Sequence, residues 1–159
     1  MANAIFPVAD RESLDEMMLQ LASSVATESR DAQTQVGCVM VSGDGERVLV
    51  TAANDLVDGA EEQPERLHRP GKYLWVEHAE RNAVYRAARC GISLQGATCY
   101  LTWWPCADCA RALIQAGVRC IVSRHPPDLS DPRWGQEFAR TEELLTACGI
   151  VRRFHKCVS

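Results

Sequence analysis

The sequence predicts an α/β fold, in which helices pack on the faces of a partly parallel sheet. From residue 78 onwards, helical segments and β-branched segments alternate three times. Each helical segment is followed by a glycine and an apolar residue, at 91–92, 117–118 and 149–150. Glycine just past a helix end commonly stops the helix. Helices and strands that alternate in this way favour a sheet with parallel strands and helical layers.

The first part of the chain predicts one helix and one hairpin. Residues 14–25 carry apolar side chains at steps of three and four, which form a stripe on a helix. The stripe consists of Leu14, Met17, Met18, Leu21, Ala22 and Val25. The β-branched runs 34–42 and 46–54 flank Gly-Asp-Gly, a tight-turn signal, and predict an antiparallel hairpin. Residues 55–72 are rich in proline, glycine and charge and predict a long surface loop, which is often functional in a compact domain.

The second part of the chain predicts three helix–strand pairs. The helices are expected at about 78–90, 106–116 and 134–148, and the strands at 97–103, 118–123 and 150–154. Between the last two pairs, Pro126 and Pro127 exclude a helix and predict a connector. We expect the 159 residues to form a single domain over 1–159.

Composition narrows the class of protein. A hydrophobic content of 47% with 24% charged residues is typical of a globular chain. A net charge of −4 weighs against a nucleic-acid partner, which normally requires a basic surface. Residues 1–13 show no basic leader followed by a long apolar stretch, and no run reaches the length of a membrane span. We therefore expect a cytoplasmic protein without membrane contacts.

In that compartment the eight cysteines are expected to stay reduced, and clustered cysteines to bind metal. Six of them fall mostly in apolar runs, where reduced core thiols are expected. These are Cys38, Cys90, Cys99, Cys120, Cys148 and Cys157.

Three residues are expected to bind a metal ion. Cys106 and Cys109, in "PCADC", have the spacing that lets two thiolates reach one ion from the first turn of a helix. His78 also falls at the start of a predicted helix. Helix N-termini carry partial positive charge, which favours the thiolate over the thiol. Three protein ligands leave one position open, as in catalytic zinc sites, and no second CxxC or HxxxH supplies an obvious fourth ligand.

Glu80 is the expected catalytic residue. Two positions along a helix rotate a side chain by about 200°, so Glu80 and His78 do not normally chelate one ion from mid-helix. At a helix N-terminus the carboxylate can instead lie beside the metal and take a proton from activated water. A lone CxxC also fits a redox pair or half of a structural zinc site. The combination H-x-E…P-C-x-x-C, however, is the signature of zinc deaminases.

At these motifs the sequence resembles the cytidine deaminase superfamily, and most closely its deoxycytidylate (dCMP) deaminase branch. The resemblance covers roughly residues 14–122 and is carried by "SRDAQTQVGCVMV" (29–41), "KYLWVEHAERNAVYRAA" (72–88) and "PCADCARALIQAGV" (105–118). Free-nucleoside cytidine deaminases usually have cysteine in the place of His78. The tRNA adenosine and guanine deaminases favour methionine where Asp108 stands.

The resemblance implies a three-layer α/β/α fold of the cytidine deaminase type, with a five-stranded mixed sheet and helices on both faces. It implies hydrolytic deamination at C4 of a cytosine ring, with zinc as the cofactor and Glu80 moving protons to N3 and to the departing amine. The first expected substrate is dCMP, converted to dUMP and ammonia. The alternative is another amino-substituted nucleobase, nucleoside or related heterocycle. The resemblance also implies a homo-oligomer whose neighbouring subunits help to form the pocket.

Three further residues are candidates for binding the substrate. Asn54 keeps the spacing of the asparagine that holds the sugar in the branch, although "AANDLVDG" (52–59) otherwise departs from its Gly-Tyr-Asn-Gly-x-Pro-x-Gly loop. Arg30 matches the basic residue of the Ser-Arg-Asp segment and is a candidate phosphate anchor, with a surface salt bridge as the alternative. Trp104, next to Trp103, is placed either to stack on a base or to pack beneath a helix.

The charged residues near the expected nucleotide site have opposite effects on a bound phosphate. The two acidic residues Asp55 and Asp58 are unfavourable to a bound phosphate. Three basic residues make the predicted loop locally positive, which suits a phosphate or a solvated face equally. These are Arg66, Arg69 and Lys72.

Overall fold

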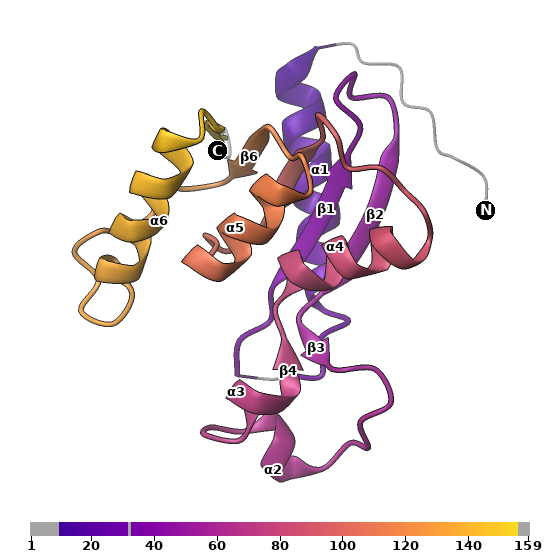
Figure 1. Ribbon diagram of the computed structural model, residues 1–159, viewed down its shortest axis with the longest axis vertical. Helices are drawn as coiled ribbons and strands as arrows, with labels where there is room; N and C mark the ends of the chain where they lie inside the picture. Colours follow the sequence, from indigo (N-terminus) through magenta and orange to yellow (C-terminus); the bar gives the residue numbers. More distant parts are fainter. Residues whose placement is uncertain (1–9, 32, 156–159) are drawn as a thin grey trace.

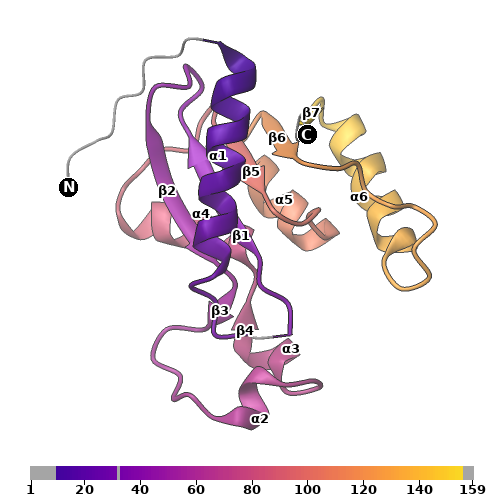
Figure 2. The same ribbon diagram turned by 180° about the vertical axis from the view of Figure 1, so that it is seen from behind.

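Five strands form one sheet in the order β2-β1-β5-β6-β7 (Figures 1 and 2). They are β1 (Gly37–Val41), β2 (Val48–Ala53), β5 (Thr98–Leu101), β6 (Cys120–Ser123) and β7 (Val151–Phe154). Strand β1 runs antiparallel to β2 and to β5, whereas β5, β6 and β7 are parallel. The structure is a computed structural model that describes residues 10–31 and 33–155. The opening residues 1–9, on which the absence of a leader was predicted, lie outside this range.

Helices cover both faces of the sheet. Helix α1 (Arg11–Ala26) packs on one face, and α4 (Ala79–Arg89), α5 (Ala107–Gln115) and α6 (Gly135–Ala147) pack on the other (Figures 1 and 2). Alternate residues of a strand face opposite sides. In β1, Val39 joins the α1 side of the core, whereas Met40 joins the α4–α5 side. The expected three-layer fold with a five-stranded mixed sheet is therefore confirmed.

Helix α1 begins where its sequence provides a cap. Asp10 precedes the helix, and its carboxylate accepts a hydrogen bond from the Ser13 amide at 2.7 Å. The predicted stripe is only partly right, because Met17 is exposed and Leu19 is buried in its place. The stripe is displaced because the buried Asp15 turns inward, where it accepts a hydrogen bond from the Tyr100 hydroxyl at 2.7 Å.

The predicted loop 55–72 contains ordered elements. Strand β3 (Asp55–Leu56) pairs antiparallel with β4 (Val76–Glu77), and between them lie α2 (Pro64–Leu67) and α3 (Lys72–Trp75). These short elements form a projection beyond one end of the main sheet (Figures 1 and 2). Each is too short to show a period in the sequence, so only their tertiary pairing reveals them. Their main consequence is to bring α3 close to the residues that follow α1.

The cysteines divide by their place in the elements. Cys38, Cys99 and Cys120 lie on strands and are buried, as expected. The prediction is wrong for Cys90 and Cys148, which are exposed because they stand at the C-caps of α4 and α6. Cys157 lies outside the described residues. Within the described range, no helix combines the length and the apolar character that a membrane crossing requires.

Candidate active site

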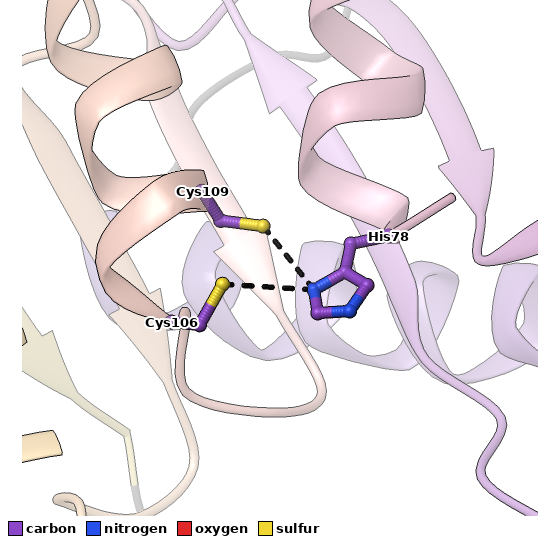
Figure 3. A group of neighbouring side chains, drawn as sticks. All are labelled: His78, Cys106 and Cys109. Carbon is purple, nitrogen blue, oxygen red and sulfur yellow. Dashed lines mark hydrogen bonds between the residues drawn. The ribbon is translucent and has the colours of Figure 1, made fainter. Parts of the chain in front are cut away.

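Two helix N-termini bring the predicted metal ligands together. His78 is the N-cap residue of α4, and Cys106 is the N-cap residue of α5. Cys109 lies in the first turn of α5, so the CxxC spacing places both sulfurs at the same helix end. Figure 3 shows the two cysteine side chains reaching from α5 toward the imidazole at the start of α4.

The three side chains have the spacing that zinc requires. Nδ1 of His78 lies 3.4 Å from Sγ of Cys109 and 3.7 Å from Sγ of Cys106. Zinc binds nitrogen at about 2.0–2.1 Å and sulfur at about 2.3 Å, so tetrahedral ligands are separated by roughly 3.6 Å. The three donor atoms all lie within 4.8 Å of one another, and no fourth His, Cys, Asp or Glu of the described chain joins them. The set therefore fits a zinc ion with three protein ligands.

Electrostatics in the cluster favour a thiolate at Cys106. A hydrogen bond from the Cys109 thiol, assisted by His78, lowers the pKa of Cys106 to about 3. The same contact with Cys106, together with burial, raises the pKa of Cys109. The lowered pKa favours the thiolate form of Cys106. Because metals bind thiolates rather than thiols, the site is already suited to a cation.

Glu80 and two of the ligands, His78 and Cys106, line one cavity of about 340 Å³. Its wall is formed by Asp31, Thr34 and Val36, by Asn54 just after β2, by residues between 69 and 81, by the loop before α5 and by the start of α6. Glu80 is 4% exposed, and burial raises the pKa of its carboxyl group. A carboxyl group whose pKa is raised is better suited to hold a proton and pass it on than an ordinary carboxylate.

Asn54 also lines this cavity, and its side chain holds two chain segments together. Its Oδ1 accepts a hydrogen bond from the Val36 amide at 2.7 Å, and its Nδ2 donates to the Thr34 carbonyl at 2.8 Å. The neighbouring Asp31 forms a buried ion pair with Lys72, which also lines the cavity. The amide is therefore fixed at the pocket wall by its own polar contacts.

Trp104 shows features of both predicted alternatives. Its ring lines the cavity and also packs against Phe154, with 5.5 Å between the ring centroids. It is 5% exposed, and its Nε1 has no hydrogen-bond partner among the described residues. Trp103 lines the same cavity but is 48% exposed.

Arg30 lies outside this set. Its Nε donates to Oδ1 of Asp55 at 2.6 Å, and Arg30 is not one of the cavity-lining residues. The alternative of a salt bridge is thus present, and the role of Arg30 as a phosphate anchor stays a prediction. Asp58 forms an ion pair with Arg89. Both acids that are unfavourable to a phosphate are therefore matched by an arginine.

The residues on one side of the cavity were not predicted from the sequence. Arg133, Trp134 and Phe138, at the start of α6, line it together with Tyr73 of α3. The segment before α6 was interpreted only as a connector. Glu137 adds a further contact, because its Oε1 accepts a hydrogen bond from the Ala107 amide, next to Cys106, at 2.9 Å. No local pattern distinguishes these residues from an ordinary helix start.

Comparison with known families agrees with this geometry. A family model of the cytidine and deoxycytidylate deaminase zinc-binding region matches residues 12–124. The chain belongs to this family. The matched region contains His78, Cys106 and Cys109, and zinc is the metal that these residues are positioned to hold.

Individual relatives have similar descriptions. An uncharacterized deaminase from the luxG 3′ region of Aliivibrio fischeri is 29% identical over 131 residues, which are 82% of this chain and 86% of the relative. The deoxycytidylate deaminase of Enterobacteria phage T2 is 47% identical over 87 residues, but these cover 52% of this chain and 43% of the phage enzyme. The chain therefore aligns with less than half of that enzyme.

Among solved structures, the fold resembles the dCMP deaminase of cyanophage S-TIM5 in complex with dCMP and dUMP. The TM-score is 0.72 at 22% identity, and the alignment covers 91% of this chain and 99% of the cyanophage protein. The likeness shows that the two proteins share the fold.

Proposed function

We propose that this protein is a zinc-dependent aminohydrolase that converts dCMP to dUMP and ammonia. The observation that carries the proposal is the position of Glu80, which lines the same cavity as the ligands His78 and Cys106. A site that only held a structural ion would not need a buried carboxyl group beside an open coordination position. The names of the phage T2 enzyme and of the S-TIM5 protein support the choice of a deoxycytidylate substrate.

The residues of the cavity have distinct roles in this reaction. Zinc, when bound, supplies a Lewis acid that activates water at neutral pH. Glu80 accepts the proton of the attacking water and delivers it to N3 of the cytosine ring. After the hydroxyl has added to C4, Glu80 takes the remaining proton of that hydroxyl and passes it to the amine. The C4–N bond then breaks, the C4 carbonyl of dUMP forms and ammonia leaves. Asn54 holds the sugar, and Trp104 lies against the base.

Exposed apolar side chains and buried thiols support a proposal for the assembly and the location of the protein. Two apolar side chains near the cavity are strongly exposed, with Leu74 at 78% and Trp103 at 48%. Their exposure supports the proposal that neighbouring copies of the chain complete the pocket in a homo-oligomer. The buried reduced thiols Cys38 and Cys99 support a cytoplasmic location. We further propose that the whole chain forms a single deaminase domain.

A second substrate class is favoured by one observation, the departure of residues 52–59 from the dCMP deaminase loop. The alternative is a deaminase of a free base, a nucleoside or a related heterocycle. Ammonia release from dCMP, CMP, deoxycytidine, cytosine and guanine separates the two. The proposal expects the highest kcat/KM with dCMP. No release from dCMP, with release from another member of the panel, would establish the alternative.

A further inference from the structure

Only some of the basic side chains around the cavity form an ion pair with a carboxylate. Four of them line it, and these are Arg69, Lys72, Arg81 and Arg133. Lys72 is paired with Asp31. Arg81 is paired with Glu77, whose Oε1 lies 2.7 Å from its Nε. The other two, Arg69 and Arg133, have no ion pair with any carboxylate in the part of the chain that the structure describes.

These two arginines meet at one oxygen atom. Nε of Arg69 donates to the Tyr73 hydroxyl at 3.1 Å, and a terminal nitrogen of Arg133 donates to the same hydroxyl at 2.7 Å. Arg133 and Tyr73 are 60 residues apart, so the contact joins α3 to the segment before α6. The Tyr73 oxygen accepts both bonds, and its own O–H therefore remains available to donate. The guanidinium of Arg133 is held over the Trp134 ring at 4.9 Å.

Two cationic groups that donate to one oxygen atom favour a bound anion. Without one, the two cationic guanidinium groups repel each other. Forked N–H groups and a hydroxyl donor match the several oxygens of a phosphate monoester, which accepts more hydrogen bonds than a carboxylate. Tyr73 is 60% exposed, whereas Glu80 is 4% exposed. Glu80 thus lies at the buried end of the cavity, whereas Tyr73 and the exposed Arg69 and Arg133 form a basic group at its solvent end.

We infer that Arg69, Arg133 and Tyr73 form the site for the 5′-phosphate of the substrate, with the base bound at the Glu80 end. This inference rests on the proposed function and deepens it, because it explains how the site would select a nucleotide over a nucleoside. It assigns the phosphate to residues of the projection and of the start of α6, whereas Arg30 is already paired with Asp55.

The test compares two substrates that differ only in the phosphate. Steady-state rates with dCMP and with deoxycytidine are measured for the wild type, Arg69→Gln, Arg133→Gln and Tyr73→Phe. We expect KM for dCMP to rise about ten- to a hundredfold for each arginine variant, since bonds to charged groups are lost. The kinetic constants for deoxycytidine should change less than about twofold. Arg140→Gln, which removes an exposed arginine of α6 outside the cavity, is the matched control.

A second readout separates binding from catalysis. Calorimetric titration with dUMP and with deoxyuridine measures the contribution of the phosphate without turnover. The wild type should bind dUMP at least about tenfold more tightly, and Arg69→Gln and Arg133→Gln should lose most of this preference. Arg133→Lys should regain part of it through its charge.

Several outcomes would overturn the inference. One is a parallel loss with dCMP and deoxycytidine, which would indicate a structural role for the cluster. Another is a loss of phosphate preference in Arg30→Gln with no loss in Arg69→Gln or Arg133→Gln. A wild type that deaminates a free base but neither dCMP nor deoxycytidine would instead contradict the proposed function itself, so the two failures are distinguishable.

Discussion

Nδ1 of His78 lies 3.4 Å from Sγ of Cys109, although 31 residues separate them in the chain. The contact arises because β5 lies between α4 and α5 in the sequence and returns the chain across the sheet, so that both helices begin on the same side. Each ligand is held by a helix start and not by a flexible loop. A metal bound there ties α4 to α5, and its loss should affect stability as well as activity.

Removal of a ligand should remove the metal. We expect one zinc per chain in the purified wild type and at least about a hundredfold weaker zinc binding in Cys109→Ser, because the set falls to two protein ligands. Elemental analysis and competition with a chelator measure this. Cys148→Ser, which changes an exposed cysteine away from the cluster, is the control and should keep one zinc. Stoichiometric zinc that resists the chelator in Cys109→Ser would disprove the ligand assignment.

Asn54 should contribute to stability as well as to substrate binding. In Asn54→Ala the half-buried Val36 amide loses its acceptor at 2.7 Å, and we expect the free energy of unfolding to fall by about 1–3 kcal/mol. Urea denaturation measures the change, with the exposed Gln136→Ala as a control. A loss of activity with dCMP at unchanged stability would show that the side chain acts on the substrate alone. Unchanged stability and activity would contradict both roles.

The ion pair of Lys72 and Asp31 should show strong coupling. Lys72→Met leaves the buried Asp31 carboxylate without its cation, and we expect a loss of about 3–5 kcal/mol in unfolding free energy. The double variant Asp31→Asn/Lys72→Met should recover a large part of that loss, because no charge is then left unpaired. A double-mutant cycle in urea measures the coupling energy. Strictly additive effects of the two substitutions would mean that the pair does not interact.

Tyr100 should make stability depend on alkaline pH. Burial and the hydrogen bond to Asp15 raise the pKa of Tyr100 above its ordinary value of about 10. The folded state thus favours the protonated phenol, so this contribution is complete below pH 10 and decreases as the pH rises above 10. We expect Tyr100→Phe to be about 1 kcal/mol less stable than the wild type at pH 8 and the difference to shrink at pH 10.5. A difference in unfolding free energy that grows with pH would contradict a raised pKa of Tyr100. Tyr85→Phe, which changes an exposed tyrosine, is the control.

The parts of the fold that the sequence predicts are those with a local signal. The hairpin, the three helix–strand pairs and the helix starts at His78 and Cys106 follow from periodicity, glycine and proline positions, and the structure confirms them. The metal cluster was predictable because the ligand spacing is itself a local pattern. Helix α1 was located correctly, but its buried face was not, since the inward turn of Asp15 depends on Tyr100 in a distant strand.

No local pattern in the sequence predicts the basic group at the solvent end of the cavity. In the sequence Arg69 is part of a charged loop, and Arg133 lies within a proline-rich connector. Their meeting at Tyr73 depends on how the projection folds back against α6. The sequence also does not show which charges are paired. From the sequence alone, Asp55 is expected to disfavour a bound phosphate. The structure shows that Arg30 matches it. Which charges remain unpaired is a tertiary property.

The role of Glu80 in proton transfer is tested most sharply by Glu80→Gln. Its zinc content and its release of ammonia from dCMP are measured together. Glutamine keeps the size of the side chain but cannot accept and return a proton. We expect Glu80→Gln to bind one zinc per chain, as the wild type does, and to have a kcat lowered by about a thousandfold or more. A variant that binds zinc and still releases ammonia from dCMP at the wild-type rate would contradict this role of Glu80.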